Sequence, residues 1–233
     1  YLRVIQLFAV YCVWQILIGS WATLGEGNPI FSGENIGTHL LRPYWALWYL
    51  FVMVVWYIVT PYVVHLRGYV WFGLAFALLY GFELENTGFL ALRKLIMFYP
   101  YFLLGNYLSE HEFIRIFEMP KNFKRRMNVR LIGGITFVAV MGFLLFEAWR
   151  DTPQEIVDFA NAFKHRFPYV DQYDGDAWLG VIKHSVIYFL SIAASLGFMM
   201  LIPMRRLPLI TRAGELSLYV YLLHVFFVMA KKT

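Results

Sequence analysis

The sequence predicts an all-α fold, a polytopic bundle of transmembrane helices. Of the 233 residues, 60% are hydrophobic and 15% are charged, whereas an average soluble domain is about half apolar and about a quarter charged. The apolar residues gather in runs, and a helix of about 20 apolar residues crosses about 30 Å of hydrocarbon. Charged loops separate these runs, so we expect the chain to cross the membrane several times.

Seven apolar runs are predicted to be helices, and we interpret each as a membrane span. They lie at about 2–24, 44–66, 68–82, 93–108, 131–149, 178–203 and 214–230. The third and fourth are short for a full crossing, so each must stand upright, end in a polar cavity or belong to a broken pair. We expect one domain over residues 1–233. Because Tyr1 directly precedes an apolar run, we also expect an N-terminal part of the protein to lie before it.

The fourth run contains an unusual segment, FYPYFLLGNYL, at 98–108. A proline inside a helix removes one backbone hydrogen bond and clashes with the carbonyl four residues earlier. Pro100 therefore predicts a kink, which would let the helix bend around a cavity. We expect Gly105 to permit the close approach of another helix, and Tyr99, Tyr101 and Tyr107 to offer hydroxyls to the interior or to the interface. The segment is then either a structural kink beside a pore or, through a tyrosine such as Tyr99, a direct substrate contact.

The polar segment at 150–177 contains one predicted surface helix. Thr152-Pro153-Gln154-Glu155 has the pattern of a capping box with proline at the first helical position. Apolar residues follow at helical spacing, namely Ile156, Phe159, Ala160, Phe163 and Phe167. This pattern predicts an amphipathic helix on the outer surface, which either covers a cavity or serves only as a packed connector.

The formal net charge of +5 is spread over the loops. This distribution argues against nucleic acid as a partner and fits loops beside anionic membrane lipid. The segment 109–130 holds six Lys and Arg residues, which places it in the cytoplasm, and we expect a multi-pass protein of a bacterial inner membrane. Lys124, Arg125 and Arg126 could hold the phosphates of a nucleotide-like cofactor, although the positive-inside rule alone explains them.

Ionisable residues inside apolar runs suggest function, because a charge within the membrane is costly. Lys183 and His184 lie toward the outer end of the run at 178–203 and could line a polar cavity. Alternatively, Lys183 extends to the interface and His184 bonds to a neighbouring helix. His224, near the middle of the last run, could accept a proton from a hydroxyl or bond to another helix.

Polar loop residues supply further candidates. His39 and Arg42 share the outer loop at 25–43, where donors and acceptors would suit a sugar, although any solvated loop has this composition. Glu83, between two short runs, could orient a substrate hydroxyl or be a solvated turn residue. We find no zinc-helix motif, phosphate-binding glycine loop, nucleophile elbow or dinucleotide-binding glycine pattern, and we expect no metal.

Three stretches together resemble one known family. RPYWALWYLFVMVVWYIVTP (42–61), LRKLIMFYPYFLLGNYL (92–108) and AGELSLYVYLLHVFF (213–227) are similar, in this order, to segments of the acyltransferase 3 family of integral-membrane O-acyltransferases. The likeness is greatest to the branch of fucose 4-O-acetylase-like enzymes. The resemblance implies a transmembrane bundle that transfers an acyl group, usually acetyl, from cytoplasmic acyl-CoA to a hydroxyl of a glycan or lipid-linked sugar.

The family's own catalytic residues do not match positions of this chain. The resemblance implies a catalytic histidine near the first helix and an R-x-x-R pair that handles CoA on the cytoplasmic side. Arg3 could be the second arginine of that pair, with its partner before Tyr1. If the base comes from this chain, His184 is the first candidate, because a sugar could reach it near a span end, and His39 is the second.

Two other classes of protein stay open. Short or broken spans are typical of transporters, so a transporter or flippase for a glycan or lipid-linked sugar is the alternative. The chain could also be a subunit or fragment whose role is interaction alone.

Overall fold

The structure is a computed structural model that describes residues 2–26, 40–43, 45–83, 89–108, 123–150, 153–202 and 208–230. These residues form helices, turns and short connections and include no strand, which confirms the all-α prediction for this part of the chain. Within it, three helices are long and apolar enough to cross a membrane. These candidate spans are Leu2–Trp21, Met127–Glu147 and Ala177–Leu201. Of the seven predicted spans, the first, fifth and sixth thus have the required length.

The chain forms two compact units. Unit 1 consists of Tyr1–Arg67, Thr87–Leu95 and Arg205–Thr233, and unit 2 consists of Gly68–Asn86 and Ile96–Met204.

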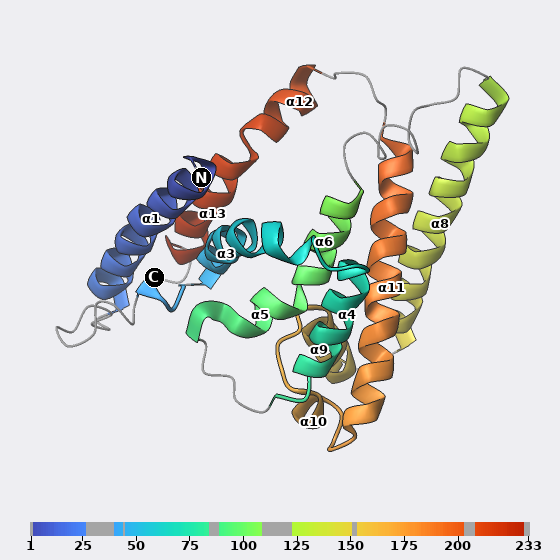
Figure 1. Ribbon diagram of the computed structural model, residues 1–233, viewed down its shortest axis with the longest axis horizontal. Coiled ribbons are helices and arrows are strands. Elements are labelled where there is room, and N and C mark those ends of the chain that lie inside the picture. Colours follow the sequence, from blue (N-terminus) through green and yellow to red (C-terminus); the bar gives the residue numbers. More distant parts are fainter. Residues whose placement is uncertain are drawn as a thin grey trace. The chain divides into compact units, whose positions relative to one another are not determined.

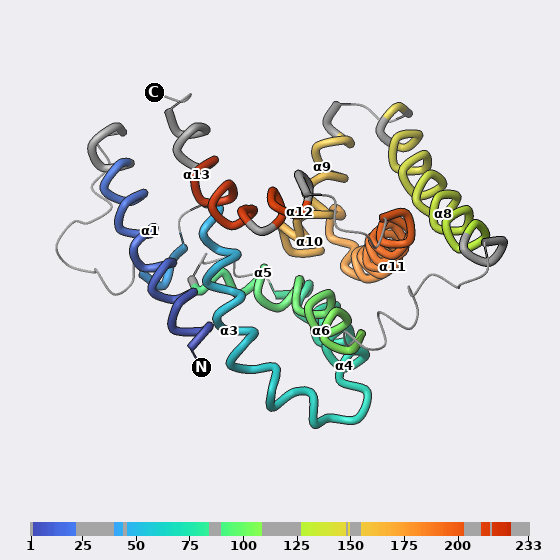
Figure 2. The backbone as a smooth tube through the Cα atoms, turned by 90° about the horizontal axis from the view of Figure 1, so that it is seen from above, coloured from blue at the N-terminus to red at the C-terminus, as the bar shows by residue number. Residues whose placement is uncertain are grey.

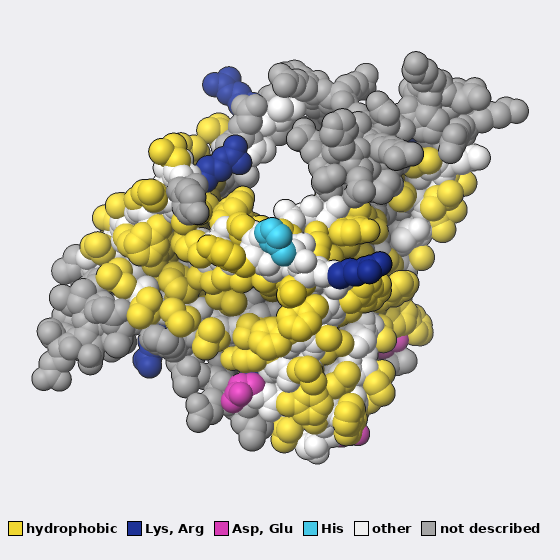
Figure 3. Space-filling model, viewed as in Figure 1, with side chains coloured by type: hydrophobic (Ala, Val, Ile, Leu, Met, Phe, Trp, Pro, Cys, Tyr) yellow, Lys and Arg dark blue, Asp and Glu magenta, His cyan; other side chains and the backbone are white. Residues whose placement is uncertain are grey.

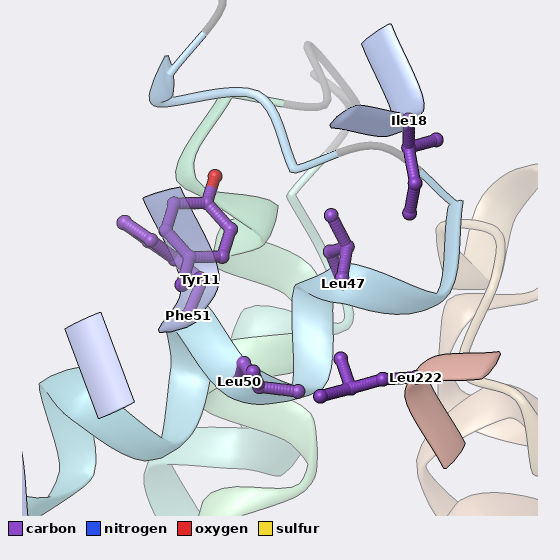
Figure 4. Close-up of a cluster of buried hydrophobic side chains, with 6 residues drawn as sticks. All are labelled: Tyr11, Ile18, Leu47, Leu50, Phe51 and Leu222. Carbon is purple, nitrogen blue, oxygen red and sulfur yellow. The ribbon is translucent and has the colours of Figure 1, made fainter. Parts of the chain in front are cut away.

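Unit 1 is built from helices at both ends of the chain. Its elements are α1 (Leu2–Glu26), the 3₁₀ helix η1 (Trp45–Leu47), α3 (Trp48–Val63), the 3₁₀ helix η2 (Phe89–Ala91), α12 (Pro208–Glu215) and α13 (Ser217–Ala230). Figure 4 shows its core, to which α1, the η1–α3 segment and α13 each contribute side chains. The buried members are Tyr11, Ile18, Leu47, Leu50, Phe51 and Leu222.

Side chains of α1 hold the segment that precedes η1. The Tyr11 hydroxyl donates to the Leu40 carbonyl at 2.5 Å, and the Gln15 amide donates to the Arg42 carbonyl at 3.0 Å. Both donors are buried among apolar side chains, where a polar group is stable only with a hydrogen-bond partner. These bonds therefore fix the segment at 40–42 against α1.

Unit 2 contains the longest helix pair. Its elements are α4 (Tyr69–Tyr80), α6 (Tyr99–Tyr107), α8 (Phe123–Arg150), α9 (Pro153–Phe163), α10 (Tyr169–Gln172) and α11 (Ala177–Leu201); α5 (Leu92–Met97) begins in unit 1 and ends in unit 2. Figures 1 and 2 show α8 and α11 side by side.

Two glycines allow α8 and α11 to approach closely. A Cβ atom on Gly197 would lie 2.9 Å from the Gly133 carbonyl oxygen and 3.0 Å from the Phe137 backbone nitrogen. A Cβ atom on Gly133 would lie 2.4 Å from the Met200 Cβ. Because helices in a membrane associate largely through close backbone packing at small residues, this glycine contact sets the separation of the pair.

The fourth predicted helix is interrupted at Phe98, close to the kink predicted at Pro100. Helix α5 ends at Met97, Phe98 caps the next helix, and Pro100 lies in the first turn of α6. The proline is tolerated there because the N–H groups of a first turn have no intrahelical partner. The expected close approach at Gly105 is not seen, since a Cβ atom there would meet no heavy atom of the described residues within 4 Å.

The predicted amphipathic helix is confirmed as α9, which begins at Pro153. Its buried side chains are Asn161 and Ala162, while Phe159 and Phe163 contact each other with ring centroids 5.0 Å apart. Helix α9 packs against α11. Phe167 lies beyond the helix, and Thr152 of the predicted capping box lies outside the described residues.

Large apolar side chains face outward on several helices. Figure 3 shows apolar atoms over much of the face in view, and Trp71 on α4 is 75% exposed. Members of this group on α8 include Leu131, Ile132, Ile135, Val138, Leu145 and Trp149. Soluble monomers rarely expose apolar patches larger than a few hundred Å², so these faces fit contact with lipid.

Replacing Gly197 with alanine should weaken the α8–α11 pair. The added methyl would meet backbone atoms, which cannot move aside as a flexible side chain can, so we expect a loss of about 1–3 kcal/mol. The measurement is the thermal unfolding midpoint of the purified protein in detergent. Gly142→Ala on α8 is the matched control, because its Cβ meets nothing within 4 Å; equal midpoints for the two variants would contradict the prediction.

Candidate functional site

Two buried histidines lie together in unit 2. His184 belongs to α11 and is 0% exposed, and His165 follows the end of α9 and is 1% exposed. Their ring centroids are 5.1 Å apart with an interplanar angle of 38°. Imidazole is the side chain best suited to accept and release protons near neutral pH, so this pair is the centre of the candidate site.

The end of α9 places His165 in the site. The Arg166 N–H donates to the Asn161 carbonyl at 3.1 Å, and the His165 N–H donates to the Ala162 carbonyl at 3.0 Å. This pair of bonds is the Schellman arrangement, in which the residue at the position of His165 has a left-handed conformation. His165 has a φ of 47°, a conformation in which histidine is enriched relative to most side chains but glycine is usual.

Aromatic rings enclose the two histidines. Tyr188 stacks on His165 with centroids 5.3 Å apart, and Phe98 meets the same imidazole edge to face at 5.2 Å. Tyr101 contacts Tyr188 at 5.1 Å. The helix break thus supplies ring contacts to the site through Phe98 and Tyr101, whereas the sequence pointed to Tyr99.

Tyr169 fits between two glycines and forms one wall of the site. A Cβ atom on Gly81 would lie 1.9 Å from the Tyr169 ring, and one on Gly180 would lie 2.5 Å from it. The Tyr169 N–H also donates to the Gly81 carbonyl at 2.9 Å. This close packing brings the Tyr169 ring to 4.7 Å from the His184 ring.

The hydrogen bonds of His184 indicate its tautomer. Its Nδ1 lies 3.1 Å from the Gly180 carbonyl oxygen and 3.5 Å from the Tyr173 hydroxyl. A carbonyl oxygen only accepts, so Nδ1 carries the proton and donates it to Gly180. In the neutral ring, Nε2 then has the lone pair and is the basic nitrogen. The Tyr173 oxygen is at most a second acceptor, which leaves its O–H to donate elsewhere.

Tyr173 connects the buried histidine to the exposed Lys183. Burial raises the pKa of the Tyr173 hydroxyl from its ordinary value of 10.0 to about 12, so the phenol is neutral at physiological pH. The Lys183 ammonium lies 4.8 Å from the centre of the Tyr173 ring, a cation–π contact. Lys183 itself is exposed, so its charge keeps contact with the surroundings of the protein.

The arrangement combines a base with a neutral hydrogen-bond donor. The Nε2 atom of His184 can accept a proton, and the Tyr173 hydroxyl can donate to an oxygen that gains negative charge. Such a pair suits reactions in which a hydroxyl is deprotonated and attacks a carbonyl.

The other predicted site residues do not gather at this pair. Arg3 and Arg42 are exposed and belong to unit 1, where the Arg42 carbonyl accepts from Gln15. Glu83 is exposed directly after α4, and Tyr99 stacks on Phe102 with centroids 6.4 Å apart.

Several predicted residues fall in parts that are not described. His39 lies outside the described residues, as do the side chains of Lys124, Arg125 and Arg126 in the first turns of α8. His224 is half-buried on α13, and its Nδ1 donates to the Tyr221 carbonyl of the same helix.

Sequence reasoning found His184 but missed His165. His165 lies in a polar connection after an amphipathic helix, where a histidine gives no signal by itself. One signal was available in the sequence: a histidine occupies the position after α9 at which a helix commonly ends with glycine. The structure also places His184 deeper than expected, since it is enclosed by rings and not open at a span end.

Comparison of the chain with protein-family models, with curated proteins and with solved structures finds no match.

The neutral state of Tyr173 gives a pH dependence. Because folding raises the pKa of the Tyr173 hydroxyl, this hydroxyl contributes to the free energy of unfolding. The contribution is fully present below pH 10 and is lost as the pH rises through about 12. We expect the Tyr173 signal to be absent from the ultraviolet titration of ordinary tyrosines near pH 10 and to emerge near 12. The difference spectrum between the native protein and Tyr173→Phe isolates it. A difference signal centred at pH 10 would contradict this prediction.

Proposed function

We propose that the protein is a membrane O-acyltransferase. It moves an acyl group, acetyl in the simplest form, from cytoplasmic acyl-CoA to a hydroxyl of a glycan or lipid-linked sugar. The observation that carries the proposal is the buried His184, whose Nδ1 donates to Gly180 with the neutral Tyr173 hydroxyl nearby, so that Nε2 is the basic nitrogen. The three candidate spans and the resemblance to membrane acyltransferases support it.

The proposed reaction balances as one acyl exchange. Nε2 of His184 accepts the proton of the acceptor hydroxyl while the hydroxyl oxygen attacks the thioester carbonyl. The Tyr173 hydroxyl donates to the oxyanion of the tetrahedral intermediate. When the carbon–sulfur bond breaks, the CoA sulfur takes the proton back from His184. The products are an ester of the sugar and free CoA, with no change of oxidation state.

Other residues have subsidiary roles in the proposal. Lys183 beside Tyr173 is proposed to contact the acceptor. Arg3 is proposed to bind a phosphate of acyl-CoA on the cytoplasmic side, because Arg pairs with phosphate. We place the protein in a bacterial inner membrane as a multi-pass protein.

Transport is the second candidate, and the helix break favours it. Helices α5 and α6 are separated at Phe98, next to the histidines, and broken helices beside a binding site are typical of secondary transporters. A transporter would move an unmodified sugar and would not require CoA.

The His184→Gln variant tests the enzyme proposal. Membranes that contain the protein receive labelled acetyl-CoA, and O-acetylated sugar is measured by mass spectrometry. Glutamine keeps a polar side chain but cannot act as the base, so we expect the rate to fall by about a hundredfold or more. His65→Asn is the control, since His65 is exposed in unit 1.

The outcomes separate three alternatives. No labelled sugar with the native protein contradicts the acyltransferase proposal. Labelled sugar with an unchanged rate in His184→Gln contradicts the assignment of the base alone. CoA-independent uptake of unmodified sugar by vesicles with the purified protein supports transport.

A further inference from the structure

We propose that His165 is a positioning residue that holds the His184 imidazole in the tautomer with its proton on Nδ1. The catalytic consequence rests on the proposed function, because it concerns the same base. The positioning itself is a property of the folded protein and can be measured without any substrate.

The backbone of His165 is the first observation. Its φ of 47° is unfavourable for a residue with a Cβ atom, and glycine is the residue that most often ends a helix in this way. A glycine would satisfy the same two backbone bonds to Asn161 and Ala162 without strain. The presence of histidine is therefore not explained by the end of α9, and its side chain must supply the reason.

The burial of the His165 ring is the second observation. The His165 side chain is 1% exposed. Burying its two polar ring nitrogens costs free energy, because their desolvation must be compensated. A leucine or phenylalanine would bury apolar area without this cost. The ring is held from two sides, by Tyr188 and by Phe98, so its position against His184 is fixed.

The surroundings of His184 show what a fixed neighbour would achieve. Two groups lie within reach of its Nδ1. Gly180 offers a carbonyl oxygen, which requires the proton on Nδ1, and Tyr173 offers a hydroxyl, which can donate to an unprotonated Nδ1. The ring thus has two possible hydrogen-bonded states, and they place the basic lone pair on opposite nitrogens.

The His165 contact selects between these states. The rings of Tyr169 and Tyr173 come from the segment directly before α11, whereas His165 comes from the end of α9. His165 therefore contacts His184 from a different segment of the chain, with the two ring centroids 5.1 Å apart. Without it, the His184 ring could rotate toward Tyr173 and move its proton to Nε2, where it could no longer act as a base.

The test uses protein with ¹⁵N-labelled histidine in lipid nanodiscs at about pH 8, where an ordinary imidazole is neutral. The ¹⁵N shifts of the two ring nitrogens report which one is protonated, and the signals of His184 are those lost in His184→Gln. In the native protein we expect the Nδ1–H tautomer. In His165→Asn, which retains a residue that tolerates the left-handed conformation, we expect a mixture of both tautomers.

Two further variants complete the set. His165→Gly relieves the backbone entirely and covers the case in which the asparagine variant does not fold. We expect it to give the same tautomer mixture. His65→Asn removes an exposed histidine of unit 1 and should leave the His184 signals unchanged.

The kinetic readout connects the tautomer to the proposed reaction. For a misplaced base we expect kcat to fall by up to about a hundredfold, with the KM for the acceptor unchanged, because the acceptor contacts are retained. A packing role alone would lower thermal stability and leave the tautomer as it is.

Each outcome decides one point. An unchanged Nδ1–H signal in both His165 variants overturns the positioning role. A tautomer mixture in a protein that transfers no acyl group supports the positioning role and removes the proposed function. A tautomer mixture with an unchanged kcat shows that His184 is positioned by His165 but is not the base.

Discussion

The need of every buried backbone carbonyl for a donor is the constraint on which this structure depends. A helix leaves its last four carbonyls without intrahelical partners, and an apolar environment offers no water to satisfy them. At the break between α5 and α6, side chains supply the donors. The Trp56 indole donates to the Leu95 carbonyl at 3.0 Å, and the Tyr188 hydroxyl donates to the Met97 carbonyl at 2.5 Å. These two donors satisfy two of the last four carbonyls of α5.

The same constraint builds the candidate site. Tyr188 can stack on His165 because its hydroxyl is already satisfied by the end of α5. His184 bonds to the carbonyl of Gly180 in its own helix, and the missing side chain of Gly180 admits the Tyr169 ring. One glycine thus provides both the acceptor for the His184 Nδ1 and the space for the Tyr169 ring beside it. The chemistry of the site follows from how its polar groups are satisfied.

The helices could be predicted from the sequence, but the site could be predicted only in part. Apolar runs located α1, α8 and α11, and the Pro153 signature located the beginning of α9, because these patterns depend on local spacing. Pro100 indicated where the helix is irregular, but the donor to the Met97 carbonyl, Tyr188, is 91 residues away in sequence and could not be predicted. His165 was missed, because the rings that contact it, those of Phe98, His184 and Tyr188, come from other segments of the chain.

The choice of neutral groups makes such a site compatible with membrane surroundings. A buried charge without a partner is among the most costly features of a protein interior. Here the fully buried positions hold imidazoles and phenols, which have a neutral form that both donates and accepts hydrogen bonds, while Lys183 is exposed with its Nζ 4.8 Å from the centre of the Tyr173 ring. In the proposed reaction, a proton transferred to His184 would create a charge only during the reaction, and the Tyr173 hydroxyl would donate to the oxyanion formed in the same step. Such a site would hold no buried ion in its resting state.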